Sequence, residues 1–534
     1  MLDLRNQHVH PFAGMDLASL LAARTEERGD HPFLIWEPFE GERLSLSYRQ
    51  FRDRARRVAA GLAKRGIKRG DFLLVHLDNC AEAMLTFFAC AEIGAVAVTT
   101  NARSSGEEIA YFAENAAVVA AITEPRFADL VAAHARNIKW LAVTPADSGL
   151  APRAGAVSKG DAFASLDGDA ANLPRRAPDP ATPLSVQFTS GTTSRPKGVL
   201  ITHANALWGG RVNAQLQTLT QADVHLTYMP LFHMNAQCYS VWATLWAGGT
   251  VVLMPRFSTS RFWNVANRNR CTWNSTIPFC LKALSEREIP QHHFRLWGTA
   301  VSEPPSDKLF RVKTIGWWGM TETITPAIVG DALHPNRPGA IGRPTTHQQV
   351  TVVRDDGTPV GPGETGNLLF RGIRGLSMFQ EYLNNPKATA ESFDELGWFK
   401  TGDRVTVFED GVIAFADRAK DMLKVGGENV AASEIEEVVR TMPYCREVAV
   451  VARKDRMLDE VPVLFVLVDG GTAKAPPDLA ERILAQCRKS LADFKVPREV
   501  RLVDELPRST LEKIAKNVLR AHLAEESGSA GRGP

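Results

Sequence analysis

Strand-like and helix-like patterns alternate along the first part of the chain, and this alternation restricts the fold more than any other feature. Ser47 and Gln50 form a capping-box pattern, after which apolar residues recur on one helical face. Residues 72–76 (FLLVH) then read as a strand, residues 80–93 as a helix and residues 95–99 (AVAVT) as a second strand. Units of this kind predict a mostly parallel sheet covered by helices.

The pattern changes twice further along the chain, whose 534 residues are too many for one core. Residues 350–415 contain short strands and turns, which predicts a β-rich region, and helix and strand alternate on a small scale after residue 431. We therefore expect an α/β protein with a large N-terminal region of helix-covered, mostly parallel sheets plus a small β-rich subdomain, and a small mobile α+β C-terminal domain. The expected bounds are 1–416 for the N-terminal domain, 417–421 for a hinge, 422–525 for the C-terminal domain and 526–534 for a disordered tail.

Charge and cysteine content exclude several classes of function. The chain has 62 Lys and Arg against 60 Asp and Glu, a balance that argues against a dedicated nucleic-acid-binding protein. No apolar run approaches the roughly 20 residues of a membrane span, and the N-terminus lacks the apolar core of a signal peptide. The seven cysteines are scattered without Cys-x-x-Cys spacing, which favours a reducing compartment. We expect a cytoplasmic protein, and the sequence leaves homo-oligomerisation open.

A loop rich in Thr, Ser and Gly (FTSGTTSRPKG, residues 188–198) follows an apolar strand. Glycines let backbone N–H groups turn inward, hydroxyls donate hydrogen bonds and Lys197 supplies a positive charge, a combination that suits a polyphosphate. Because the lysine precedes the last glycine, the loop does not match a Walker A motif. The residues expected to contact phosphate are Thr189, Ser190, Gly191, Thr192, Thr193 and Lys197.

This loop and the motifs that follow it resemble those of the adenylate-forming enzymes, a family that includes acyl-CoA synthetases, plant hydroxycinnamate–CoA ligases, firefly luciferase and the adenylation domains of peptide synthetases. The further motifs are PLFH at 230–233, GTA at 298–300, WGMTE at 318–322, WFKTGD at 398–403, DRAKD at 417–421 and PRSTLEKI at 507–514. The resemblance covers nearly the whole chain. Within the family, HLDNCAEA at 76–83 and TTNARSS at 99–105 are most similar to bacterial carnitine/crotonobetaine-type CoA ligases.

The resemblance implies a role for each motif. His233 would close over the acyl carboxylate, and Glu322 would hold Mg²⁺, a hard cation that prefers carboxylate oxygen. Asp403 would accept hydrogen bonds from both ribose hydroxyls, which a carboxylate can do. Lys513 would bridge the acyl carboxylate and the α-phosphate during adenylation. The other residues implied for ATP or AMP are Gly298, Thr299 and Ala300 against the adenine, Trp318 stacked on it, the adjacent Gly319, Met320 and Thr321, and Arg418 at the ribose.

The implied activity is that of an ATP-dependent acyl-CoA ligase, which uses ATP and Mg²⁺ and takes CoA as its co-substrate. A carboxylic acid would first attack ATP and release pyrophosphate. The small domain would then rotate about Lys420, and Gly426 and Gly427 would help to form the channel for CoA. One position departs from the family pattern, because the glycine usual before the catalytic lysine is Glu512 here. A glutamate held at φ > 0 would be strained, which would slow adenylation.

Two alternatives remain open beside the CoA ligase. An adenylating enzyme that loads the phosphopantetheine of a carrier protein would share these motifs, although no carrier-domain segment follows residue 520. A degenerate nucleotide-binding protein, which belongs to another class of function, is suggested by Glu512 alone. Acid-dependent release of pyrophosphate and its dependence on CoA would distinguish the three.

The expected acyl pocket lies beside His233 and the adenine-stacking residue. Its predicted members are Asn235, Cys238, Trp317 and Gly319. Gly319 stands where acetate-specific relatives place a tryptophan, so we expect an acid larger than acetate. Trp317 is bulkier than the small residue usual at its position and would narrow the pocket again.

The acid itself is left open by the sequence. Met234 and the neutral Asn235 stand where an anion would be needed to pair with a quaternary ammonium, which argues against carnitine, although aromatic cages also bind such cations. A medium or branched aliphatic acid, an aryl acid and a steroid-derived acid all fit the remaining pattern.

Overall fold

The computed structural model describes residues 10–152, 159–189, 196–418, 422–507 and 514–529. By its internal contacts the chain falls into two units. The larger unit consists of Met1–Ala102, Phe112–Phe188 and Gly198–Asp417, and the smaller one of Arg103–Tyr111, Thr189–Lys197 and Arg418–Pro534. Among the described residues, no helix combines the length and the apolar character that a membrane span requires.

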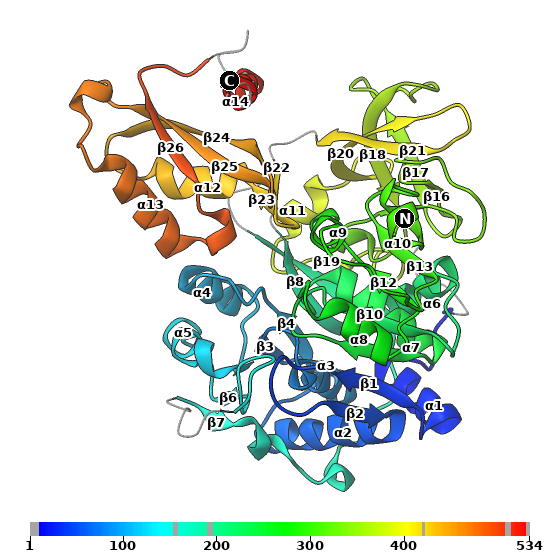
Figure 1. Ribbon diagram of the computed structural model, residues 1–534. Coiled ribbons are helices and arrows are strands. Elements are labelled where there is room, and N and C mark those ends of the chain that lie inside the picture. The colour runs from blue at the N-terminus through cyan, green and yellow to red at the C-terminus, as the bar shows by residue number, and fades with distance from the viewer. Residues whose placement is uncertain (1–9, 153–158, 190–195, 419–421, 508–513, 530–534) are drawn as a thin grey trace. The chain divides into compact units, whose positions relative to one another are not determined.

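An eight-stranded sheet of the larger unit is parallel over most of its width (Figure 1). Its strands, in spatial order, are β19 (Glu381–Tyr382), β9 (Lys197–Thr202), β8 (Pro183–Thr189), β4 (Val96–Thr99), β3 (Phe72–His76), β5 (Ala120–Thr123), β6 (Leu141–Val143) and β7 (Asp161–Ala162). The strands expected at 72–76 and 95–99 are β3 and β4, which pair in parallel. Both are buried, as is typical of parallel strands covered by helices.

Helix α3 (Ala81–Ile93) connects β3 to β4 and is apolar on every side. Such a helix is stable only when it is surrounded by protein, and most of its residues are indeed buried. It packs against α2 (Tyr48–Lys64), which begins at the predicted Ser47–Gln50 capping box. Helix α3 ends at Gly94, whose φ of 74° is the left-handed conformation that glycine adopts without strain.

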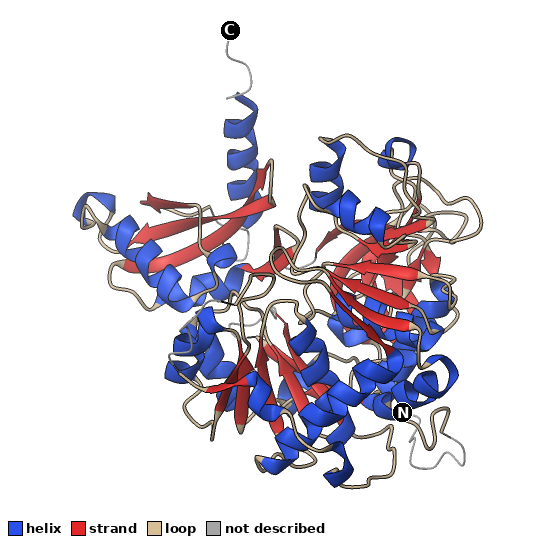
Figure 2. Cartoon of the chain, turned by 60° about the horizontal axis from the view of Figure 1, so that its bottom comes forward, coloured by secondary structure: helices blue, strands red, loops and turns tan. Residues whose placement is uncertain are grey.

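A nine-stranded sheet is the second sheet of the larger unit, and its central strands are also parallel. In spatial order it contains β16 (Arg343–Pro344), β15 (Ile328–Val329), β14 (Lys313–Trp318), β13 (Leu296–Thr299), β12 (Trp273–Ser275), β10 (Val224–Thr227), β11 (Thr250–Leu253), β1 (Pro32–Trp36) and β2 (Leu44–Ser47). Figure 2 shows the strands of the larger unit in red among its blue helices. The largest fully buried side chains include Trp242, Trp273 and Trp297.

The remaining helices cover these sheets. They are α1 (Leu17–Arg28), α4 (Gly106–Asn115), α5 (Ala128–His134), α6 (His203–Leu216), the π-helix η5 (Asn235–Trp242), α7 (Ala243–Ala247), α8 (Phe262–Arg268), α9 (Pro278–Ser285), α10 (Ser306–Phe310) and α11 (Pro386–Glu391). Short 3₁₀ turns are η2 (Pro125–Phe127), η3 (Phe163–Leu166), η4 (Ala170–Asn172) and η6 (Thr321–Thr323). The π-helix is noteworthy because such helices are rare and concentrate at functional sites.

The predicted β-rich region is a four-stranded sheet of the larger unit. It contains β17 (Gln349–Val353), β18 (Thr365–Arg371), β20 (Phe399–Val407) and β21 (Ile413–Arg418), in that order. β18 pairs antiparallel with β17 and with β20. Together with the two larger sheets it confirms the expected α/β fold.

The smaller unit contains a five-stranded sheet with helices on both faces. Its elements are β22 (Met422–Val425), β23 (Glu428–Ala431), α12 (Ala432–Arg440), β24 (Cys445–Asp455), β25 (Asp459–Val468), η7 (Thr472–Lys474), α13 (Leu479–Ser490), η8 (Asp493–Lys495), β26 (Glu499–Val503) and α14 (Lys516–Ser529). Val448 and Val450 belong to the core shared with α12 and α13, whereas Ala449 and Val451 belong to the core shared with α14. This alternation is the two-residue period of a strand buried on both faces.

The tail expected to be disordered from residue 526 is helical over its first residues, because α14 continues to Ser529. Arg501 of β26 forms an ion pair with Glu526, at 2.7 Å between Nη2 and Oε2. This pair joins the helix to β26, a long-range contact that local composition does not reveal. Residues 530–534 lie outside the described residues.

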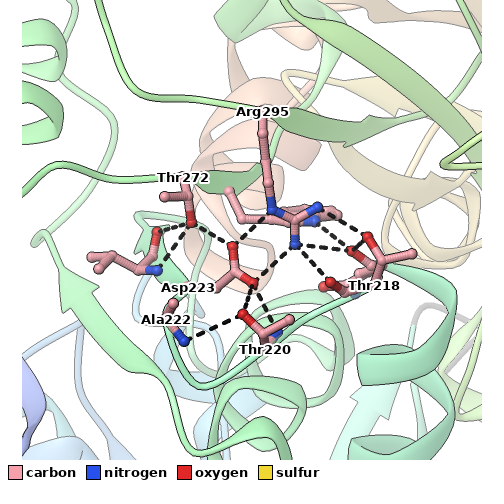
Figure 3. A network of polar contacts seen from close by, with 9 residues as sticks. Thr218, Thr220, Ala222, Asp223, Thr272 and Arg295 are labelled. Carbon is pink, nitrogen blue, oxygen red and sulfur yellow. Dashed lines mark hydrogen bonds and ion pairs between the residues drawn. The ribbon is translucent and has the colours of Figure 1, made fainter.

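A network of polar contacts closes the ends of neighbouring strands in the larger unit (Figure 3). Arg295 donates to Asp223 at 2.8 Å, and Thr272 donates to the same Asp223 oxygen at 2.7 Å. Arg295 also donates to the backbone and hydroxyl oxygens of Thr218. Burial alone would raise the pKa of Asp223, but the hydrogen bonds from Arg295, Thr272 and the Thr220 backbone outweigh burial and lower it. The network therefore favours the ionised carboxylate in the folded state.

Asp223→Asn is expected to lower the free energy of unfolding by about 1–2 kcal/mol at neutral pH, because charge-assisted hydrogen bonds are lost. Since the folded pKa of Asp223 lies below its unfolded value of about 3.9, this stability is present above about pH 4 and is lost as the pH falls further. Urea unfolding of wild type and variant at a series of pH values would measure it. Asp410→Asn, in an exposed pair with Arg343, is the control and should cost less than about 0.5 kcal/mol. A stability difference that stays constant with pH would contradict the assignment.

Candidate active site

Two predicted motifs meet at the carboxyl edge of the nine-stranded sheet. Gly298 and Thr299 end β13, and Trp318 ends the neighbouring strand β14, with Gly298 paired to Ile315 in parallel register. Ala300 and Met320 follow these strands in loops, and Thr321 begins the 3₁₀ turn η6. Because the carboxyl ends of parallel strands meet at one edge, the sheet brings the two motifs together.

A hydrogen bond joins Trp318 to a third motif. The Trp318 indole Nε1 donates to Asp403 Oδ2 at 2.7 Å. Asp403 lies in β20 and is only 9% exposed. A buried carboxylate with a second oxygen is suited to accept further donors. The predicted adenine-stacking residue and the predicted ribose-binding residue are therefore in direct contact.

Glu322 has a partner that sequence reasoning missed. The hydroxyl of Tyr382, on β19, donates to Glu322 Oε1 at 2.8 Å, and the Glu322 side chain is 4% exposed. Burial and the adjacent Glu322 carboxylate raise the pKa of Tyr382 well above its usual range. Tyr382 therefore stays protonated and remains a donor. No local pattern marks this tyrosine, because it lies 60 residues away in the chain.

Two aromatic side chains fill the space beside the glycines of the expected acyl pocket. Trp317 stacks on Trp273 with ring centroids 5.5 Å apart and an interplanar angle of 15°. A Cβ atom on Gly298 would lie 2.0 Å from the Trp317 ring, and one on Gly319 would lie 2.3 Å from the Tyr239 hydroxyl. Trp317 and Tyr239 thus occupy the room that these glycines provide.

The other two predicted pocket residues have partners of their own. Asn235, at the start of η5, accepts a hydrogen bond from the Ser275 hydroxyl at 2.7 Å. Cys238 faces α6. The Nδ2 atom of Asn213 lies 3.3 Å from the Cys238 Sγ, and a Cβ atom on Gly209 would lie 2.3 Å from the same sulfur. Burial raises the pKa of the Cys238 thiol, so this cysteine is an uncharged packing residue.

His233 lies in a turn that leads into the π-helix. Its backbone N–H donates to Pro230 O at 3.0 Å, and its own carbonyl accepts from the Gln237 N–H at 3.1 Å. The His233 ring is partly buried and is tilted against Phe232, with centroids 4.5 Å apart. The turn holds the imidazole at the edge of η5.

The structure describes only some residues of the loop at 188–198 and of the C-terminal motifs. Thr189 ends β8 and Lys197 begins the adjacent strand β9. Gly426 and Gly427 form the tight turn between β22 and β23 with φ of 58° and 88°, values that need glycine. Arg418 ends β21, and only its backbone is described. Ser190, Gly191, Thr192, Thr193, Lys420, Glu512 and Lys513 lie outside the described residues.

Comparison with known proteins places this geometry in a family. Residues 21–383 match the model of the AMP-binding enzyme family, and residues 434–513 match that of the AMP-binding enzyme C-terminal domain. The chain is 32% identical to a crotonobetaine/carnitine–CoA ligase of Salmonella paratyphi A, over 95% of this chain and 99% of the relative. It is 33% identical to the enzyme of the same name from Escherichia coli O139:H28, over the same shares.

Solved structures give the same result. A Mycobacterium tuberculosis fatty acyl CoA synthetase has a TM-score of 0.67 and 26% identity, with 95% of this chain and 98% of that chain covered. An o-succinylbenzoate CoA synthetase double mutant from Bacillus subtilis has a TM-score of 0.80 at 24% identity, with 94% and 97% covered, and shares the fold. The chain belongs to the AMP-binding enzyme family, and it is an ATP-dependent acyl-CoA ligase that acts through an acyl-adenylate.

Proposed function

We propose that this ligase joins CoA to a carboxylic acid that is larger than acetate and carries no cationic group, with the predicted site residues in the roles that the family resemblance implies. The acid's oxygen forms a bond to the α-phosphorus of ATP, and the bond from that phosphorus to the β-phosphate oxygen breaks to release pyrophosphate. The sulfur of CoA then bonds to the acyl carbon, and AMP leaves. The names of the two relatives described above give crotonobetaine or carnitine as the acid. The acid proposed here differs from these in lacking a quaternary ammonium.

The nucleoside half of the proposed site rests on one observation, the 2.7 Å hydrogen bond between Trp318 and Asp403. It holds the aromatic face for adenine beside the carboxylate for ribose. A carboxylate has two oxygens with several lone pairs, so Asp403 can accept hydrogen bonds from ribose hydroxyls as well as from the indole. This arrangement supports adenosine recognition.

Glu322 is the proposed magnesium ligand. Mg²⁺ is usually bound by one or two carboxylates together with phosphate oxygens of the substrate. The described residues contain no group of three His, Cys, Asp or Glu side chains able to hold a metal ion. Bound there, Mg²⁺ would neutralise charge on the phosphates. Tyr382 keeps Glu322 Oε1 oriented, so the chain itself fixes the direction of the carboxylate.

We propose an acid without a cationic group because Met234 and the uncharged Asn235 follow His233, so this turn supplies no carboxylate to pair with such a group. Asn235 and Ser275 bond to each other, and His233 is the ionisable group on this turn. The seven cysteines are all buried and free of disulfides, which supports the proposal that the enzyme acts in the reducing cytoplasm.

The proposed function is tested by pyrophosphate release from MgATP with a panel of acids, with and without CoA. Release is expected with acids that are larger than acetate and carry no cationic group, and it should become multiple-turnover, with AMP as product, only when CoA is present. Acetate and carnitine are the matched negative controls. Release that CoA does not affect would indicate a carrier-protein acceptor, and ATP binding without release from any acid would contradict the proposal.

A further inference from the structure

Asn79 connects the two large sheets of the larger unit and has no part in the site described above. It follows β3 of the eight-stranded sheet and directly precedes Cys80, the N-cap of α3. The Cys80 Sγ accepts from the Ala83 N–H at 3.3 Å, and the Ser148 hydroxyl donates to the Asn79 carbonyl. The Asn79 side chain is 2% exposed. The start of the helix therefore holds this side chain at a defined place beside the carboxyl end of β3.

The amide of Asn79 bonds to the edge of the nine-stranded sheet. Its Nδ2 donates to the carbonyl of Met229, two residues after β10, at 3.0 Å and to that of Met254, directly after β11, at 3.1 Å. Its Oδ1 accepts from the Leu231 N–H at 2.8 Å. A flipped amide would bring its oxygen against two carbonyls and its NH₂ against an N–H. Asn79 is therefore fixed in orientation as well as in position.

Two of these bonds hold the start of the turn that bears His233. Met229 and Leu231 flank Pro230, and the Pro230 carbonyl accepts the His233 N–H at 3.0 Å. A proline has no N–H, so the backbone here can be held only through its carbonyls and through the N–H groups on either side. Asn79 bonds to one of each kind, which fixes where the chain enters the turn.

Gln237 holds the other end of the same turn. Its Nε2 donates to the Leu231 carbonyl at 2.7 Å, and its backbone N–H donates to the His233 carbonyl at 3.1 Å. The Gln237 side chain is 4% exposed. Leu231 is thus bonded through its N–H to Asn79 and through its carbonyl to Gln237. The turn cannot shift without leaving a buried amide unpaired, and an unpaired buried donor or acceptor is costly.

We propose that Asn79 is a positioning residue for the first half-reaction, because its amide sets where His233 lies against the carboxylate of the acid. The inference rests on the proposed function, in which His233 closes over that carboxylate. Asn79 touches no reacting atom and acts only through the turn at 230–233. Catalysis is sensitive to such an anchor, since a misplacement of about 1 Å can cost on the order of 100-fold in rate.

The test is acid-dependent pyrophosphate release by the full-length protein, with whichever of hexanoate, octanoate, benzoate and phenylacetate wild type uses best. Asn79→Ala removes three hydrogen bonds and should raise KM for the acid by about tenfold or more. The Kd for MgATP, measured by calorimetry without acid, should stay unchanged. A protein that is merely destabilised would instead lose kcat with its folded fraction and keep both constants.

Asn205→Ala is the matched control, because Asn205 makes equivalent bonds elsewhere in the larger unit. Asn205 is fully buried, donates to the carbonyls of Leu376 and Met378, both at 2.8 Å, and accepts from the Thr202 N–H at 3.0 Å. Its loss should cost a similar amount of stability in urea unfolding and leave KM for the acid unchanged. An equal rise of KM in this variant and in Asn79→Ala would overturn the inference.

Gln237→Met provides a second arm that does not put the fold at risk. It keeps the volume and the backbone N–H of the residue and removes only the donor to the Leu231 carbonyl. It also removes Gln237 Oε1, a buried oxygen without a hydrogen-bond partner within the described part of the chain. KM for the acid should rise by about fivefold, the effect of one hydrogen bond. If Asn79→Ala does not fold, this variant decides, and an unchanged KM would overturn the inference.

Failure of the proposed function would look different from failure of the inference. Wild type would then release no pyrophosphate with any of the four acids, and the inference would fall with the function. An active wild type whose KM for the acid is the same in folded Asn79→Ala would leave the ligase intact and remove Asn79 from the positioning of His233.

Discussion

Asp403→Ala is expected to lower kcat/KM for ATP on the order of 100-fold or more, because two hydrogen bonds to a charged acceptor at about 1.5 kcal/mol or more each are lost. The loss should appear mainly in ATP binding, measured by calorimetry. In the wild type, 2′-deoxy-ATP and 3′-deoxy-ATP should each bind more weakly than ATP, since each lacks one ribose hydroxyl. The variant should not distinguish the three nucleotides.

Trp318→Phe is the matched control for this prediction. It removes the indole N–H that donates to Asp403 at 2.7 Å but keeps an aromatic face for the adenine. We expect at most about a tenfold loss in ATP affinity, since one charge-assisted hydrogen bond is removed, and discrimination among the deoxy nucleotides should persist. If Asp403→Ala still distinguished ATP from its deoxy analogues, Asp403 would not contact the ribose.

The large elements of the fold could be predicted from local sequence because burial determines their patterns. Residues 72–76 are a run of buried residues between turns, and residues 80–93 are apolar on all sides, so each segment needs protein around it. The observed elements, β3 and α3, agree with these expectations to within a residue. The end of α14 was not predictable in this way, because Glu526 pairs with Arg501, which is distant in sequence.

The candidate site was predictable only where residues form a local motif. Trp318 and Glu322 lie in one short segment, so the resemblance located both of them. Their partners, Asp403 and Tyr382, come from separate strands. Asp403 belongs to the WFKTGD motif and was therefore predicted, whereas Tyr382 belongs to none of the motifs and was missed. The sequence could not show that its hydroxyl meets Glu322, because the pairing of β19 with β9 sets its place.

The stack of Trp317 on Trp273 shows the same limit for the acyl site. Trp317 was expected to narrow the pocket, but the sequence contains no sign of its partner on β12. Packing between distant elements decides where space remains in a protein, and a single sequence reports only which residues are apolar.

Glu322→Gln is expected to reduce the rate of pyrophosphate release on the order of 1000-fold, because a neutral amide replaces the charged oxygen that a hard cation prefers. Tyr382→Phe should act differently. It leaves the carboxylate in place but removes the donor 2.8 Å from Glu322 Oε1, and loss of such an orienting partner typically costs about tenfold or more in metal affinity. The Mg²⁺ concentration for half-maximal rate should rise about tenfold, with kcat at saturating Mg²⁺ close to wild type.

The control for Tyr382→Phe is Tyr239→Phe, which removes an equally buried hydroxyl that faces Gly319 instead of Glu322. Binding of Mn²⁺ in the presence of ATP, followed by electron paramagnetic resonance, provides a readout that does not depend on turnover. It should weaken in Tyr382→Phe and in Glu322→Gln and stay unchanged in Tyr239→Phe. Equal Mn²⁺ affinity in wild type and Tyr382→Phe would mean that the hydroxyl only fills space beside Glu322. A matching loss in both tyrosine variants would instead trace the effect to general packing, because the two substitutions share nothing but the deletion of a buried hydroxyl.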